Sequence, residues 1–131
     1  ALGMKLEEAP AIVAGGRGVG SAENFKDLEE VATTLGGLVG ATRAACDSGF
    51  ISPSVQIGIT GKVVSPDLYI AVALSGASQH MSGCLGSKVI VAINKDADAN
   101  VFKDARYGIV GDFKQVLPAF NEKCKELLGS S

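Results

Sequence analysis

The stretch LSGASQHMSG, residues 74–83, follows directly on the apolar run LYIAVA and contains the only histidine of the chain, His80. It approaches the G-x-S-x-G nucleophile elbow of hydrolases but lacks the second glycine. His80 stands two residues after Ser78, and no second histidine can act as a distant base, so a Ser-His hydrolase is excluded. Two interpretations of the imidazole remain: a capping or partly buried side chain, and a ligand contact.

Glycines, hydroxyl residues and arginines follow other apolar runs as well. GGRGVGS, residues 15–21, follows one run, and ATRAACDSG, residues 41–49, follows the next. Backbone N–H groups at such glycines can approach a ligand closely, and a nearby guanidinium favours an anion. GGRGVGS matches neither G-x-x-x-x-G-K-[ST] nor G-x-G-x-x-G, so a flexible glycine turn is the alternative. Arg17 favours the anion contact.

The elements that position these residues alternate along the chain. Unbroken apolar runs predict strands at 11–16, 38–42, 68–74, 87–93 and 107–112. Helical periodicity predicts a helix within 21–37 capped by Ser21, and an amphipathic helix within 113–129. Pro118 indicates that the last helix either starts near Leu117 or is kinked in its first turns. Segment 43–49 is ambiguous, with one or two helical turns at most.

Strands that are apolar throughout and alternate with helices indicate a parallel sheet with helices on both faces, a three-layer α/β domain. Such sheets bind ligands outside the carboxyl ends of their strands. We expect this domain to span residues 11–128, after a linker or the tail of a preceding domain at 1–10 and before a C-terminal tail at 129–131.

Composition narrows the function classes. With 131 residues, 47% hydrophobic and 20% charged, the chain fits one globular domain. A formal net charge of −2 argues against a nucleic-acid partner or an anionic membrane surface, and no apolar stretch is long enough for membrane insertion. Three dispersed cysteines and one histidine indicate a reducing compartment and no metal site.

Five segments together resemble the FAD-binding C-terminal domain of the electron transfer flavoprotein alpha subunit, over about residues 11–127: GGRG, GATRAACDSG, QIGITGKVVSPDLYIAVALSGASQHMSG, VIVAINKDADANVF and YGIVGD. The resemblance implies a Rossmann-like sheet of the DHS-like NAD/FAD-binding type, FAD as cofactor, and a heterodimer with the beta subunit. It also implies an electron carrier and not an enzyme. Electrons would come from flavin dehydrogenases such as the acyl-CoA dehydrogenases of fatty acid beta-oxidation, and pass to a membrane quinone reductase or another acceptor. The compartment would be the bacterial cytoplasm or, alternatively, the mitochondrial matrix.

The resemblance assigns cofactor contacts by position. Arg43 is expected against the isoalloxazine, the Thr60 hydroxyl near flavin N5, and His80 toward the pyrimidine edge. The segment from Ser75 to His80 would wrap the ribityl and phosphate region, with Asn94 and Asp112 on the adenosine side. The expected cofactor-binding residues are Arg17, Thr42, Arg43, Ile57, Gly58, Ile59, Thr60, Gly61, Ser75, Gly76, Ala77, Ser78, Gln79, His80, Asn94 and Asp112.

Two other classes remain as alternatives. An NAD(P)-binding domain of a dehydrogenase or transhydrogenase would share the fold, but the G-x-G-x-x-G turn with its acidic partner is absent. A cofactor-free interaction domain would not need Arg43, Thr60, Gln79 and His80. One departure from the family is Ile59, where many members have glutamine; a backbone contact at this position would survive the change, and a side-chain amide contact would not.

Overall fold

The computed structural model describes residues 3–129, and a five-stranded sheet lies at its centre. The strands are β1 (Ala11–Gly15), β2 (Leu38–Ala41), β3 (Leu68–Val72), β4 (Val89–Asn94) and β5 (Tyr107–Val110). All pairings are parallel and the order is β2-β1-β3-β4-β5, so the predicted parallel sheet is confirmed. The chain moves outward from β1 to β2 and then crosses back to β3, which places the topological switch point between β1 and β3.

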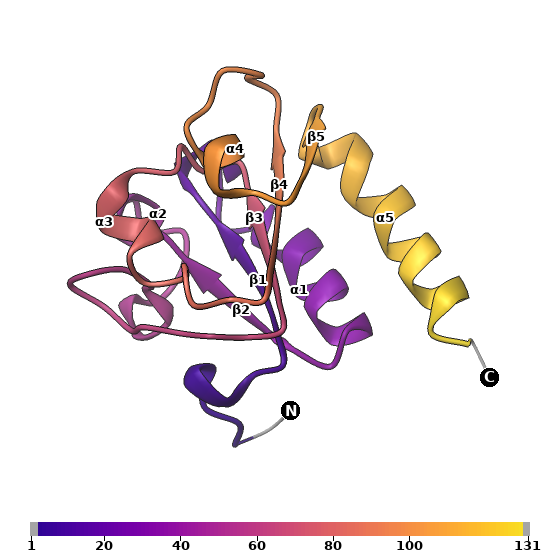
Figure 1. Cartoon of the computed structure of the whole chain (residues 1–131), viewed down its shortest axis with the longest axis horizontal. Helices are drawn as coiled ribbons and strands as arrows, with labels where there is room; N and C mark the ends of the chain where they lie inside the picture. Colours follow the sequence, from indigo (N-terminus) through magenta and orange to yellow (C-terminus); the bar gives the residue numbers. More distant parts are fainter. Residues whose placement is uncertain (1–2, 130–131) are drawn as a thin grey trace.

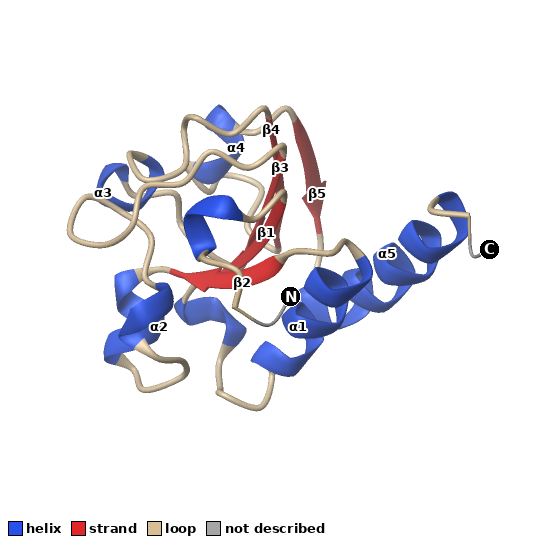
Figure 2. Cartoon of the chain, turned by 90° about the horizontal axis from the view of Figure 1, so that it is seen from below, coloured by secondary structure: helices blue, strands red, loops and turns tan. Residues whose placement is uncertain are grey.

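Helices cover both faces of the sheet, which confirms the three-layer architecture. On one face lie α1 (Phe25–Thr34) and α5 (Phe113–Leu127), which run side by side in both views (Figures 1 and 2). The opposite face carries α3 (Ser78–Met81) and α4 (Val101–Asp104). The short α2 (Arg43–Asp47) follows β2 directly. Single 3₁₀ turns occur at Leu6–Glu8, Arg17–Val19 and Pro53–Val55.

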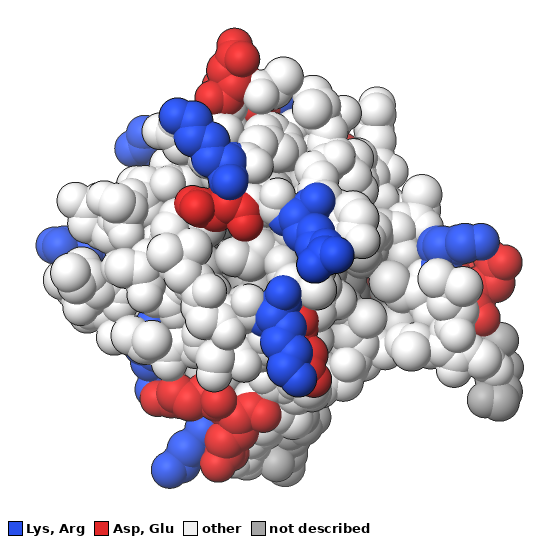
Figure 3. Space-filling model, viewed as in Figure 1, with Lys and Arg blue, Asp and Glu red and all other residues white. Residues whose placement is uncertain are grey.

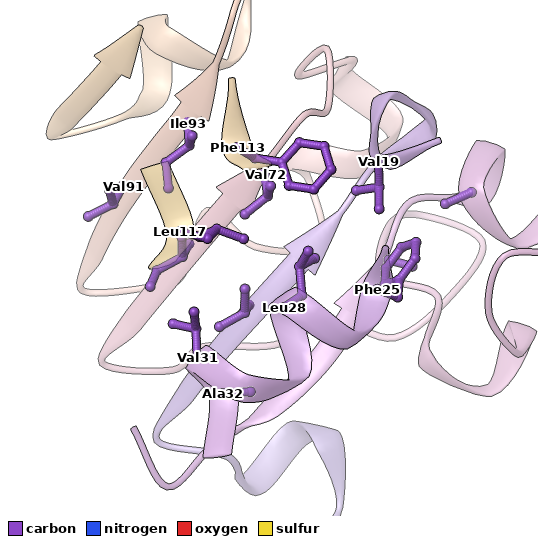
Figure 4. Close-up of a cluster of buried hydrophobic side chains, with 14 of the residues drawn as sticks. Val19, Phe25, Leu28, Val31, Ala32, Val72, Val91, Ile93, Phe113 and Leu117 are labelled. Carbon is purple, nitrogen blue, oxygen red and sulfur yellow. The ribbon is translucent and has the colours of Figure 1, made fainter. Parts of the chain in front are cut away.

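Two hydrophobic clusters, one on each face, explain why the strands are apolar throughout. Successive strand residues point to opposite faces, so Ile70 and Val72 enter one cluster while Tyr69 and Ala71 enter the other. In the first cluster, Leu28 of α1 and Leu117 of α5 pack against the sheet (Figure 4). Each of the two helices is apolar on one face only. Burial of that face against the sheet holds the helix in place.

Several element boundaries differ from the predictions. The first helix begins at Phe25, because Ser21 Oγ accepts the N–H of Asn24 (3.2 Å) and caps a turn before the helix. The last helix begins at Phe113 and contains Pro118, so the interpretation that it starts near Leu117 is wrong. The strand predicted at 68–74 ends at Val72, because Ala73 adopts a left-handed conformation (φ 53°).

The N-terminal segment partly packs onto the domain. Leu6 and Ala9 are buried in the second cluster, so part of the expected linker contacts the core. The domain limits at 11 and 128 stay predictions, and positions 130–131 of the expected tail lie outside the described residues.

Within residues 3–129, no helix has the length and apolarity to cross a membrane. Charged side chains of both signs are scattered over the face in Figure 3.

Candidate functional site

A cavity of about 970 Å³ opens at the carboxyl edge of the sheet, at the switch point between β1 and β3. Its walls come from the segments that follow β1, β2, β3 and β4, together with the loop 56–60. Its volume lies at the upper end of the range for ligand sites, as a dinucleotide requires. The cavity brings together all the expected cofactor-binding residues except Gly61, Ser78 and Asp112.

The glycines after β1 allow two backbone segments to touch at the switch point. Gly16 N–H donates to the Val72 carbonyl (3.0 Å), and Gly18 N–H donates to the Ala73 carbonyl (3.2 Å). A Cβ at Gly16 would lie 2.5 Å from Leu74 Cβ, and one at Gly18 would lie 2.8 Å from the Ala73 oxygen. Any side chain at either position would therefore push the two walls of the cavity apart.

The segment after β3 offers backbone donors to the cavity. The Leu74 carbonyl accepts from the Asn94 side-chain amide (2.9 Å), and the Ser75 carbonyl accepts from Val101 N–H (2.9 Å). Within residues 3–129, no hydrogen-bond acceptor pairs with the N–H groups of the three residues that directly precede α3, which are Ser75, Gly76 and Ala77. The carbonyl groups of this wall are engaged in hydrogen bonds within the protein, while three of its N–H groups have no acceptor there. The wall is therefore suited to an anionic group such as a phosphate.

Two guanidinium groups, those of Arg17 and Arg43, also line the cavity. Arg43 Nε lies 3.5 Å from Asp47 Oδ2 at i,i+4 spacing, and the two side chains are 69% and 68% exposed. Such an exposed pair contributes about 0.3–0.5 kcal/mol, so little free energy opposes a rotation of Arg43 toward a ligand. The site therefore carries mobile positive charge at the ends of β1 and β2.

Two threonine hydroxyls are oriented by hydrogen bonds that leave their protons free. Thr42 Oγ1 accepts the N–H of Ala45 (3.2 Å) and caps α2. Thr60 Oγ1 accepts from Gln56 Nε2 (3.0 Å). Because each oxygen is already an acceptor, its own O–H can be donated to an acceptor on a ligand in the cavity. Gln56 itself lines the cavity and was not among the expected residues.

His80 is buried at the cavity wall, with 6% of its surface exposed. Its Nδ1 lies 2.9 Å from the Ile57 carbonyl oxygen, and its Nε2 lies 2.7 Å from the Tyr69 hydroxyl. Since a carbonyl can only accept, Nδ1 carries the proton and Nε2 accepts from Tyr69 in the neutral ring. Burial lowers the pKa of His80 below its usual value, which favours that neutral form. The structure thus shows a buried imidazole, where the sequence suggested a capping or partly buried one, and the ligand contact stays a prediction.

Three expected residues lie outside this cavity for identifiable reasons. Gly61 N–H donates to the Gly58 carbonyl (3.0 Å) and closes a turn, and Ser78 is the first residue of α3. Asp112 caps α5 through a bond from Lys114 N–H to its Oδ1 (3.0 Å) and lines an adjoining cavity of about 120 Å³. The two cavities share Gly18, Ala73 and Asn94, so Asp112 lies beside the main site and not within it.

The loop after β4 contributes four wall residues that the expected set omitted, namely Asp96, Asp98, Ala99 and Asn100. Asn94 orders the start of this loop, because its Oδ1 accepts the N–H of Asp96 (2.9 Å) while its amide holds Leu74. Both the oxygen and the nitrogen of the Asn94 side-chain amide thus bond to the backbone of the cavity wall, and Asn94 holds two segments of that wall together. The polar run NKDADAN directly after a strand was the signal that could have identified this loop.

Comparison with known proteins places the chain in one family. A family model described as the electron transfer flavoprotein FAD-binding domain matches residues 5–85. The chain is 58% identical over 125 residues to the electron transfer flavoprotein subunit alpha of Bacillus subtilis, covering 95% of this chain and 38% of that protein. It is 56% identical over 122 residues to the mitochondrial subunit alpha of Dictyostelium discoideum, covering 93% of this chain and 34% of that protein. The chain is 54% identical over 129 residues to the electron transfer flavoprotein subunit alpha of Megasphaera elsdenii, covering 97% of this chain and 38% of that protein. The chain thus spans little more than a third of the length of these relatives.

Proposed function

Because the chain belongs to the family of electron transfer flavoprotein FAD-binding domains, we propose that the cavity at the carboxyl edge of its sheet is the FAD site. The observation that carries the proposal is the convergence of thirteen of the expected cofactor-binding residues, from four separate strand ends and a loop, on one cavity of about 970 Å³. FAD, when bound, supplies one- and two-electron redox chemistry; the protein supplies binding, orientation and electrostatics.

The pyrophosphate and ribityl region would be held by the wall after β3. The free N–H groups of the three residues from Ser75 to Ala77 and the guanidinium of Arg17 supply donors and positive charge of the kind that a phosphate needs. The close packing of Gly16 and Gly18 against this wall keeps the donors in place. Gln79 extends the same wall, and the loop after β4 would close the adenosine side, with Asp112 in the adjoining cavity.

The isoalloxazine would be contacted by Arg43 and the loop 57–60. Arg43 brings a permanent planar cation that can stabilise negative charge developing on the ring. Thr60, with its oxygen held by Gln56, can donate its proton toward a ring acceptor. Ile59 would contribute through its backbone, because its side chain is 69% exposed. His80 would contribute a wall and not a hydrogen bond, because both its nitrogens already have protein partners.

We further propose that the whole protein is an electron carrier and not an enzyme with an organic substrate of its own. It would receive electrons from flavin dehydrogenases such as acyl-CoA dehydrogenases and deliver them to a membrane quinone reductase or another acceptor. Its partner would be the beta subunit, with which it would form a heterodimer. The compartment would be a reducing one, either the bacterial cytoplasm or the mitochondrial matrix, because an odd and dispersed set of three cysteines is typical of such compartments.

A flavin spectrum and an anaerobic reduction test this function. Purified protein reconstituted with FAD should show the absorption of protein-bound oxidised flavin, and NADH alone should not bleach it. A reduced flavoprotein dehydrogenase, added without oxygen, should bleach it. Binding of NAD⁺ in place of FAD, or direct reduction by NADH, would contradict the proposal and favour a dehydrogenase domain.

A further inference from the structure

Tyr69 lies beneath the cavity and not in it. Its side chain belongs to β3, is 0% exposed and is surrounded by the second hydrophobic cluster. A buried phenol in an apolar cluster costs free energy unless its hydroxyl is hydrogen-bonded, so the partner it has is informative. Its hydrogen-bond partner is His80 Nε2, 2.7 Å from the hydroxyl oxygen, and the Cys84 thiol is a further neighbour of the hydroxyl.

The direction of this hydrogen bond follows from the other side of the imidazole. The Ile57 carbonyl can only accept, so His80 donates from Nδ1 and must accept at Nε2 from Tyr69. Burial raises the pKa of Tyr69 and lowers that of His80, so both groups keep the protonation that this chain of bonds requires. The hydroxyl of Tyr69 therefore selects one tautomer and one orientation of the ring.

The chain of bonds ends on the loop that lines the cavity. Ile57 is the second residue of the loop 56–60, and its N–H donates to the Ala41 carbonyl (2.9 Å). Beyond it, Ile59 N–H donates to the Gln79 carbonyl (2.8 Å), and Gly58 N–H donates to the carbonyl of Lys62, just after the loop (3.1 Å). The imidazole of His80 thus connects the loop to β3. The loop is also connected to α3 by a backbone hydrogen bond to Gln79, the residue that precedes His80.

Resting on the proposed FAD site, we infer that Tyr69 is a positioning residue for that site, acting through the His80 ring on the Ile57 carbonyl and hence on the loop 57–60. Tyr69 contacts neither the cavity nor anything bound in it. Its hydroxyl fixes the ring, the ring fixes the carbonyl, and the carbonyl sets where Thr60 presents its hydroxyl. A phenylalanine would fill the same volume without the first of these bonds.

The sequence makes a direct test feasible because His80 is the only histidine and the chain has two tyrosines, Tyr69 and Tyr107. With ¹⁵N-labelled histidine, a long-range ¹H–¹⁵N spectrum of the 131-residue chain reports a single imidazole. The unchanged chain should show a proton on Nδ1 and an unprotonated Nε2. In Tyr69→Phe, the Nε2 resonance should move downfield because its hydrogen bond is lost. Tyr107→Phe makes the same chemical change at a residue that is 60% exposed and should leave the spectrum unchanged.

The consequence for the site is measured separately. In Tyr69→Phe, hydrogen exchange at the amides of Ile59 and Gly61 should accelerate, and the Kd for FAD should rise about tenfold, since a lost buried hydrogen bond of about 1.4 kcal/mol is a factor of ten. Val31→Ala, which removes buried methyl groups under α1 on the other face, serves as the stability control. It should lower the Tm without changing the imidazole spectrum or the FAD affinity.

Three outcomes would overturn the inference. The first is a proton on Nε2 in the unchanged chain. The second is an Nε2 resonance that does not move in Tyr69→Phe. The third is a Tyr69→Phe variant that loses stability like Val31→Ala but keeps its loop exchange rates and its affinity for FAD. An unchanged chain that binds no FAD would instead contradict the proposed function, while the imidazole spectrum and the exchange rates still decide the role of Tyr69.

Discussion

Replacing Arg43 by alanine should change the redox potential of bound FAD far more than the stability of the fold. In the structure Arg43 is 69% exposed and pairs with Asp47 over 3.5 Å. An exposed i,i+4 pair contributes about 0.3–0.5 kcal/mol, so the Tm should fall by about 2 °C at most. The same guanidinium lines the cavity, where it can meet the charge that reduction adds to the flavin.

The expected shift in potential follows from Coulomb's law. Two unit charges about 4 Å apart interact by about 1 kcal/mol in water and about 4 kcal/mol at the effective dielectric of a protein surface. Because most of Arg43 faces solvent, the lower part of this range applies. A loss of about 1.4 kcal/mol in the reduced form lowers a one-electron potential by about 60 mV.

A spectroelectrochemical titration of the FAD-loaded protein measures this shift. Asp47→Ala is the matched control, because it breaks the same ion pair but keeps the cation, and its potential should not fall. Arg43→Lys keeps the charge as a mobile point charge and should show an intermediate potential. An unchanged potential in Arg43→Ala, or an equal fall in Asp47→Ala, would refute the assignment of Arg43 to the flavin and leave it a helix-surface residue.

Two further predictions concern stability. Since FAD binds the folded state, a hundredfold excess over Kd should add about 2.7 kcal/mol to the free energy of unfolding and raise the Tm, which differential scanning calorimetry measures; no shift would mean that FAD does not bind this chain. The pKa of His80 is lowered in the folded state, so the unfolded chain binds the extra proton below its ordinary pKa of 6.5. The free energy of unfolding should therefore be constant with respect to His80 above pH 6.5. As the pH is lowered from 6.5 to the folded-state pKa, it should decrease by up to about 1.4 kcal/mol per pH unit. Urea titrations should show a shallower fall for His80→Gln, and equal slopes would exclude His80 as the cause.

The architecture was predictable because each central strand buries both of its faces. Tyr69 and Ile70 enter opposite clusters, and this double burial gives an unbroken apolar run in the sequence. The exposed edge strand β5 was recognisable from the alternation of strands and helices along the sequence, although Tyr107 and Val110 face solvent. The short α3 was not predicted, since its four residues are too few to show helical periodicity.

The site was predictable only in part, because strand ends are visible in a sequence and tertiary hydrogen bonds are not. Arg17, Thr42 and Thr60 were identified by the resemblance and do line the cavity. The partners of His80 were not foreseen: the Ile57 carbonyl lies 23 residues away in the chain, and Tyr69 looked like an ordinary apolar strand position. Asp112 was placed in the site by family resemblance, but capping α5 holds its carboxylate in the adjoining cavity.

Mapping FAD onto the chain by NMR shows whether the cavity at the carboxyl edge of the sheet is the FAD site. Titrating FAD into ¹⁵N-labelled protein should shift the amide resonances of Arg17, Arg43, Thr60 and Gly76, which come from four separate segments of one cavity wall. The amides of Lys123 and Glu126, near the far end of α5, should not move. Shifts confined to α5 or to the opposite edge of the sheet, or no shifts at saturating FAD, would show that this cavity is not the FAD site.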